Sequence, residues 1–245
     1  MANVIGQRIG GNIVYIDKGA HGKRVVGAIG ADVIHYEFLP WVHNIQDEDA
    51  TGTDPEGFFT TVVEVGTGTS EMDQSNTVGI LAQMVTAANE NDGISLQLIG
   101  PHFEFTSNQS LVYFGIEIDI NDIDTSDIFV GLAVEDTALL GAVADGVYIH
   151  SLDGATTSIG NTEKNATATA SSSLGTLSDN TFHFLEFYFD GTSVYFFVDG
   201  AGEQINTTNI PDDVAMTVSL EFLAGSAVAS TCDIRQLRVI QIGRT

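Results

Sequence analysis

Short runs of aromatic and β-branched residues, each closed by an Asp-Gly pair, most restrict the folds open to this chain. Residues 182–189 are followed by Asp190-Gly191, and residues 194–198 are followed by Asp199-Gly200. Asp-Gly is a favoured pair for the tight turn that joins two antiparallel strands. The spacing therefore predicts consecutive β-hairpins in this part of the chain.

Strand patterns extend beyond these hairpins. Residues 111–120 end in alternating apolar and polar side chains, as expected for a strand with one buried face, and residues 214–223 and 234–242 predict two more strands. Residues 77–88 have apolar side chains at helical spacing but also fit a bulged strand, which we favour. Many short strands and few helices predict an all-β sandwich or barrel.

The length of the chain fits one large domain. A domain of 245 residues can bury a core that needs no disulfide or metal ion to fold. The single cysteine, Cys232, has no partner for an internal bridge, and we expect a buried, inert thiol. The first residues lack the apolar segment of a secretory signal, and no apolar run approaches the ~20 residues that span a bilayer. We therefore expect a protein made in the cytoplasm without a membrane partner.

The charge of the chain is strongly negative. It has 33 acidic and 8 basic residues, a formal net charge of −25, and residues 25–163 contain no Lys or Arg. Affinity for nucleic acid comes largely from cationic side chains that displace counterions from phosphates. We therefore expect that the protein does not bind DNA or RNA. A surface of this kind favours solubility and opposes nonspecific self-association.

The first 35 residues differ from the rest in composition. Glycines separate short apolar pairs there, which predicts a glycine-rich extended N-terminal arm (1–35) ahead of a sandwich domain (36–245). An extended segment with little core of its own gains order by packing on a neighbour. Because four of the cations lie in this arm, we expect it to dock on a partner or on another copy through these side chains: Arg8, Lys18, Lys23 and Arg24.

One strand invites a test for catalysis. Retaining glucanases of the jelly-roll class carry Glu-x-Asp-x-Glu or Glu-x-Asp-x-x-Glu on a strand, with two carboxylates about 5–5.5 Å apart as nucleophile and acid/base. Here Glu117 and Asp119 share a face, but Asn121 and Asp122 stand at the third position. The acid/base residue is missing, and we expect no enzyme activity.

Two acidic clusters offer oxygen ligands of the kind that calcium prefers. The first contains Asp122, Asp124 and Asp127, and the second lies in residues 46–57. Neither has the spacing Asp-x-Asp-x-Asp-Gly, so a solvated acidic loop is the favoured interpretation and no cofactor other than calcium is considered. The six histidines are scattered without a zinc-site spacing.

From Asn91 onward, turn and strand motifs follow one another in a specific order. The segments are Asn91-Asp92-Gly93, the strand before Asp119, residues 126–137, 145–149, 187–191 and 198–200, and Pro211-Asp212-Asp213. Their order resembles a concanavalin A/laminin-G-like family found among structural proteins of tailed phages, over about the last 155 residues and without the arm. The resemblance implies an antiparallel jelly-roll β-sandwich, a role as a capsid decoration protein, and no catalytic residues.

The leading hypothesis is therefore a virion protein on the capsid surface, with the major capsid protein as partner and a homo-oligomer, trimer or dimer, as the docking unit. The alternative is a carbohydrate-binding adhesion module on the virion that contacts a host glycan. Exposed aromatic rings would distinguish it, and the candidates are Trp41 and Tyr148, with Tyr36 as a third. A glucanase is the least favoured reading.

Overall fold

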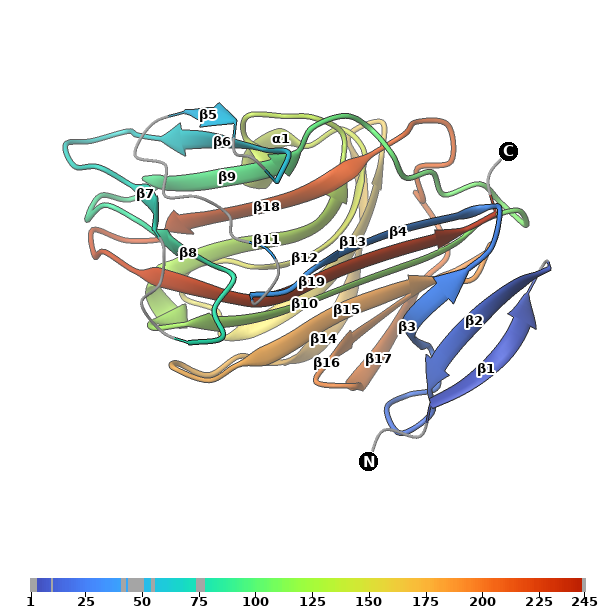
Figure 1. Ribbon diagram of the computed structural model, residues 1–245. Helices are drawn as coiled ribbons and strands as arrows, with labels where there is room; N and C mark the ends of the chain where they lie inside the picture. Colours follow the sequence, from blue (N-terminus) through green and yellow to red (C-terminus); the bar gives the residue numbers. More distant parts are fainter. Residues whose placement is uncertain are drawn as a thin grey trace.

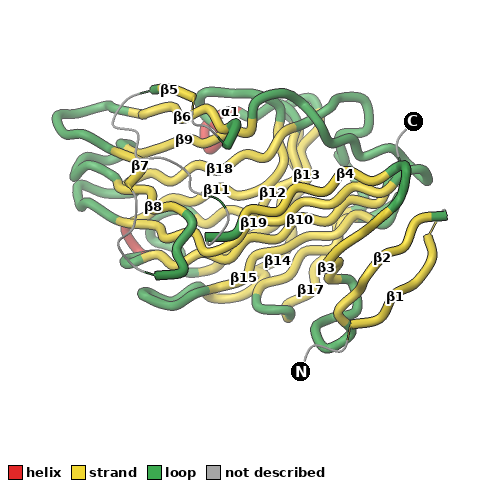
Figure 2. Tube along the Cα trace, viewed as in Figure 1, coloured by secondary structure: helices red, strands yellow, loops and turns green. Residues whose placement is uncertain are grey.

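The computed structural model describes residues 4–9, 11–40, 43, 51–53, 56–73 and 78–243. In these residues, two large antiparallel sheets lie face to face and a small third sheet lies beside them (Figures 1 and 2). The sequence-based expectation of an antiparallel jelly-roll sandwich is confirmed. No helix in the described part of the chain is long and apolar enough to cross a membrane.

Sheet 1 has the strand order β17-β16-β15-β10-β19-β8-β7, and β19 also pairs with β4. The first residues of β19 pair with β8 and its later residues with β4, so one long strand serves two neighbours. The bounds are β4 Val33–Phe38, β7 Glu71–Asp73, β8 Ala82–Val85, β10 Leu111–Ile120, β15 His183–Phe189, β16 Val194–Val198, β17 Ala201–Asn206 and β19 Thr231–Ile242.

Sheet 2 has the order β14-β13-β12-β11-β18-β9-β6-β5. Two short helical segments accompany it, the 3-10 turn Ile123–Thr125 before β11 and α1 (Leu139–Ala142) after it. The bounds are β5 Gly52–Thr53, β6 Phe58–Val63, β9 Gly93–Leu98, β11 Ser126–Ala133, β12 Gly146–Ser151, β13 Thr157–Lys164, β14 Thr167–Thr176 and β18 Thr217–Ala224.

Alternation along the strands builds the core between the sheets. In β10, the side chains from Val112 to Ile120 at every second position are buried in the core, and those between them lie on the outer face of sheet 1. Phe114 and Phe187 stack at 5.0 Å between ring centroids. Gly160 of β13 has no side chain because a Cβ there would stand 2.4 Å from the ring of Phe196 in the opposite sheet. Close packing of this kind fixes the distance between the sheets.

The predicted hairpins and strands are present. Asp199 and Gly200 both have positive φ, +53° and +73°, as the two-residue turn between β16 and β17 requires. Within residues 77–88, the favoured strand is confirmed as β8. Cys232 is fully buried, and burial raises the pKa of its thiol, as expected for an inert side chain.

The arm is extended, and it is pleated into a three-stranded antiparallel sheet, here called the leader sheet. It consists of β1 (Val4–Ile9), β2 (Asn12–Asp17) and β3 (Arg24–Ile29). β4 already belongs to sheet 1, so the arm ends before Val33 rather than at residue 35. The neighbour that orders it is the chain's own sandwich: buried side chains of β2 and β3 pack on Tyr113, Ile240 and Ile242.

Candidate functional site

The leader sheet is fastened to the outer face of sheet 1 by a buried carboxylate. Glu186 of β15 is fully buried, and Arg24 donates two hydrogen bonds to it, at 3.0 and 2.7 Å. The hydroxyl of Tyr113 donates a third, at 2.9 Å. Burial alone would raise the pKa of Glu186, but the hydrogen bonds from His21 and Arg24 and the charge of Arg24 outweigh it and lower this pKa.

Two more side chains of the leader complete this contact. The ring of His21 stacks on Phe197 at 3.6 Å, with Nε2 at 3.0 Å from a Glu186 oxygen. The backbone N–H of Lys23 donates to Nδ1 of His21, which holds the ring in this position. Lys23 Nζ pairs with Glu203 at 2.8 Å and lies 3.4 Å above the ring centroid of Tyr195.

The four cations expected to dock on a partner therefore divide into two pairs. Lys23 and Arg24 bind acidic side chains of the chain's own sandwich, and their role in docking on a partner stays a prediction. Arg24 supplies the counter-charge that the buried Glu186 needs, whereas Lys23 pairs with the exposed Glu203. Arg8 and Lys18 are exposed, and neither forms an ion pair within the described residues.

We predict that Arg24→Ala loosens the leader sheet, because it leaves Glu186 buried without its main cation. Breaking such a pair costs about 3 kcal/mol. Hydrogen exchange should accelerate in residues 12–29 and stay slow in β10 and β19. Arg8→Ala, which removes an unpaired cation of the same sheet, is the control; equal protection in the two variants would contradict the assignment.

The Glu117 strand lacks the arrangement of a glucanase. Glu117 accepts hydrogen bonds from Arg235 at 3.2 Å and from Gln236 at 3.1 Å. Asp119 lies opposite Asp233 on β19, and burial, followed by the charge of Asp233, raises the pKa of Asp119. At the third position, the Asn121 side chain accepts from the Thr231 N–H and shapes a turn.

The three aspartates proposed as calcium ligands are not brought together. Asp127 is buried and accepts the N–H of Asp153, whereas Asp124 is exposed. The backbone carbonyl of Asp122 accepts the Ser126 hydroxyl. No group of three His, Cys, Asp or Glu side chains suited to a metal ion occurs within residues 78–243 or the other described segments. The second acidic cluster, in residues 46–57, lies largely outside them.

Tyr148, one of the aromatic residues proposed for sugar contact, is not an exposed platform in the structure. Tyr148 is only 6% exposed, because its ring stacks on Phe129 and its hydroxyl donates to Glu163 at 2.7 Å. The expectation that the Tyr148 ring is exposed is therefore wrong. The alternation of side chains along β12 places Tyr148 on the outer face of sheet 2, but the segment that contains α1 covers that face. Trp41 lies outside the described residues.

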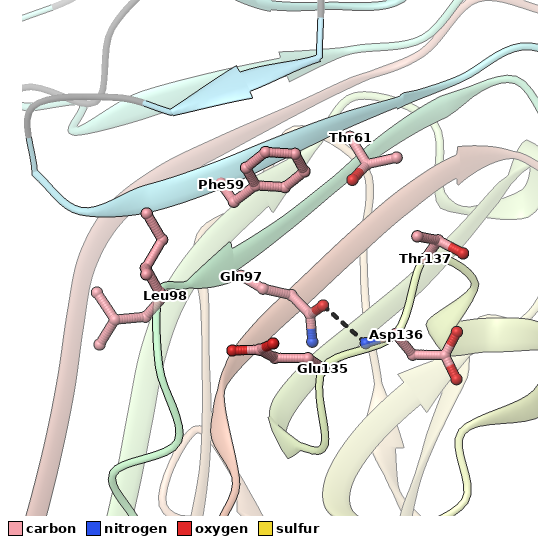
Figure 3. A pocket seen from close by; sticks show the side chains of 8 residues that line it. Phe59, Thr61, Gln97, Leu98, Glu135, Asp136 and Thr137 are labelled. Carbon is pink, nitrogen blue, oxygen red and sulfur yellow. Dashed lines mark hydrogen bonds between the residues drawn. The ribbon is translucent and has the colours of Figure 1, made fainter.

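A groove of about 400 Å³ lies instead at the other end of sheet 2 (Figure 3). One wall is β6 and β9, and the other is the segment that follows β11. Phe59 is 41% exposed, because Phe58 takes the core-facing position next to it. The lining residues are Phe59, Thr61, Gln97, Leu98, Ile99, Glu135, Asp136 and Thr137.

Gln97 fixes the two walls relative to each other. Its amide group donates to the Ser219 hydroxyl at 2.7 Å and to the Val134 carbonyl at 3.2 Å. Its carbonyl oxygen accepts the Asp136 N–H at 3.0 Å (Figure 3). Because all three hydrogen bonds of the Gln97 amide are formed, this side chain holds the two walls at a fixed distance. The groove is therefore preformed.

A buried carboxylate lies beneath the same segment. Glu221 of β18 is 1% exposed and accepts the N–H of Leu140 in α1 at 2.6 Å. Burial raises its pKa to about 7, and the charges of Asp136 and Asp127 add to the effect, while the N–H groups of Leu140 and Leu139 oppose it. The proton on Glu221 is thus exchanged near neutral pH, next to the wall of the groove.

We predict that Glu221 makes stability fall as the pH rises from about 4.5 to about 7. In this window the unfolded chain has lost a proton that the folded chain retains, so the folded state binds more protons and loses stability with increasing pH. The loss is on the order of 3 kcal/mol. Urea unfolding of Glu221→Gln, which keeps an acceptor for Leu140, should show a smaller loss than the parent between pH 5 and pH 8. Glu135→Gln is the control; identical pH slopes in all three proteins would refute the assignment.

Comparisons with known proteins show the fold. A protein of unknown function from Shewanella oneidensis MR-1 superposes with a TM-score of 0.56 at 14% identity, over 88% of this chain and 89% of that one. The carbohydrate recognition domain of Emp46p, in metal-free form, gives 0.53 at 10% identity, over 76% and 88%. A β-glucanase from Bacillus licheniformis gives 0.50 at 13% identity, over 81% and 98%.

No known family matches the sequence, and no curated protein sequence matches it either. At these identities the structural likenesses establish a shared fold alone. They confirm the concanavalin A-like sandwich that the sequence resemblance implied. Membership of the phage structural family stays a prediction. Two of the three structures named above are a carbohydrate recognition domain and a β-glucanase.

Proposed function

We propose that the chain is a carbohydrate-binding module and that the groove beside Phe59 is its contact surface. The observation that carries the proposal is an exposed aromatic ring in a preformed groove, surrounded by carboxylate and hydroxyl groups. Ligand sites combine an apolar surface with a few fixed polar groups in this way. The presence of a carbohydrate recognition domain among the structures with this fold supports the same class of ligand.

The groove suits the two sides of a sugar ring. The apolar C–H face of a pyranose can lie on Phe59, while Thr61, on the same strand, offers a hydroxyl. Glu135 and Thr137 are exposed on the facing wall and can bond the hydroxyls at the rim of the sugar. The groove is open, which favours a stretch of a polysaccharide over a small, enclosed ligand.

The proposal is binding without turnover. Glu117 lies on the outer face of sheet 1, whereas the groove lies on the outer face of sheet 2. Glu117 is engaged by Arg235 and Gln236, and no glutamate occupies the third position that a retaining glucanase needs.

We predict that Phe59→Ala weakens glycan binding about tenfold, because a stacked aromatic contact contributes about 1 kcal/mol beyond the area that it buries. Titration calorimetry with mixed-linkage β-glucan oligosaccharides, after a glycan-array screen, measures the change. Leu152→Ala removes a side chain of similar exposure, 45%, outside the groove and should have no effect. The proposal would be wrong if the array gave no signal, or if the Phe59→Ala variant bound glycan with the same affinity as the parent.

A second candidate function is decoration of a virion surface, and the leader sheet favours it. Val4, Ile13, Tyr15 and Ile29 are exposed by 37–64%, and the strand register places all four on one face. Arg8 lies on the same face, opposite Ile13. An apolar patch with an unpaired cation is typical of a protein–protein contact. The partner we propose is the major capsid protein of a tailed phage, with Lys18 at the edge of the contact.

We predict that Ile29→Asp reduces binding to tailed-phage heads prepared without their decoration protein. A charge within the patch would be buried in the contact without a partner. Cosedimentation with the heads should fall at least tenfold, while Val65→Asp, at a residue 70% exposed elsewhere, should bind like the parent. Equal cosedimentation of the two variants would exclude this face as the docking surface.

A further inference from the structure

The leader sheet has an open edge. β1 pairs with β2 and with no other strand of the described chain, and Figure 1 shows it on the side away from the sandwich. The edges β14 and β17 of the two large sheets, by contrast, contact each other. An edge strand without cover leaves a row of backbone N–H and C=O groups free to pair with another strand.

The outward face of this edge carries a cation at one end and an anion at the other. Arg8 has no acidic partner in the part of the chain that the structure describes, although the protein has a net charge of −25. Asp17 lies on the same face at the far end of β2, opposite Val4. Its carboxylate accepts the local N–H of Gly19, and Asp17 also lies opposite Arg24 of β3, whose pKa its charge helps to raise. A cation and an anion at opposite ends of one edge make that edge self-complementary.

We infer that β1 pairs antiparallel with β1 of a second copy of this chain, about a two-fold axis at Gly6. Two leader sheets would then form one six-stranded sheet. In this register Arg8 lies opposite Val4 of the second copy, and Asp17 of that copy is on the next strand in the same row. Neighbouring strands are about 4.8 Å apart, so the two Cα atoms are about 10 Å apart, within reach of an arginine and an aspartate side chain. The symmetry creates this ion pair twice.

Glycine at the centre of the edge fits this pairing. Tyr15 lies across the outward face: a Cβ on Gly6 would stand 3.5 Å from its ring, and a Cβ on Gly27 would stand 3.7 Å from the opposite ring edge. Pairing at Gly6 places two residues without side chains opposite each other at the axis, so that the two tyrosine rings can lie side by side. The exposed apolar residues of both copies then form one continuous face.

The dimer is tested without any glycan or particle, so the result is independent of both proposed functions. Analytical ultracentrifugation of the full chain over a range of concentrations should detect a reversible dimer. Arg8→Glu and Asp17→Arg each replace two attractive contacts with two repulsive ones and should weaken the dimer at least tenfold. Lys18→Glu makes the same change of charge in the β2–β3 turn, away from the edge, and should dimerise like the parent.

A mixture of the two edge variants separates charge pairing from misfolding. In a heterodimer of Arg8→Glu with Asp17→Arg, both contacts join opposite charges, so the equimolar mixture should recover the dimer that neither variant forms by itself. Recovery supports the register. A parent chain that stays monomeric, variants that dimerise unaided, or a mixture that stays monomeric would each overturn the inference.

Discussion

The buried carboxylate of Glu186 is the interaction on which the arrangement of the molecule depends. A charge at that depth on the outer face of a sheet is tolerated only with a cation and hydrogen bonds around it. Arg24, His21 and Tyr113 supply them, and two of the three come from the leader. The leader sheet is therefore an integral third layer over part of sheet 1. Since its inner face is used for this contact, only its outer face and the β1 edge remain to meet another molecule.

The sandwich could be predicted from the sequence because its signals are local. Asp-Gly turns and the alternation of apolar and polar side chains each involve only a few neighbouring residues. The contacts of the leader could not be predicted in this way. The pairing of Arg24 with Glu186 spans most of the chain, and nothing near Arg24 in the sequence distinguishes it from Arg8. The same applies to Tyr148: alternation correctly places it on the outer face, yet the burial of that face by α1 is a property of the tertiary structure.

The groove illustrates the same limit. Alternation of Phe58 and Phe59 indicates that one ring points outward, so an exposed aromatic residue could have been identified. The facing wall could not, because residues 134–137 meet β9 only through the order of strands β11-β18-β9 in sheet 2. The Glu117 strand shows the opposite case. A shift in the β10–β19 register next to Glu117 leaves Arg235 outside the regular pairing and beside that carboxylate, and the sequence pattern gives no sign of this.

The positions of the two surfaces relate the two candidate functions. The leader packs on the outer face of sheet 1, and the groove opens on the outer face of sheet 2. A molecule held through its leader therefore presents the groove on the opposite side, so docking and glycan binding do not compete for space. If two copies pair along β1, each dimer carries two grooves at a fixed separation. Two sites on one rigid support bind a repetitive polysaccharide more tightly than either site does alone, because the second contact forms within the same complex. If the groove binds glycan as proposed, a modest affinity at each site is then sufficient for stable binding.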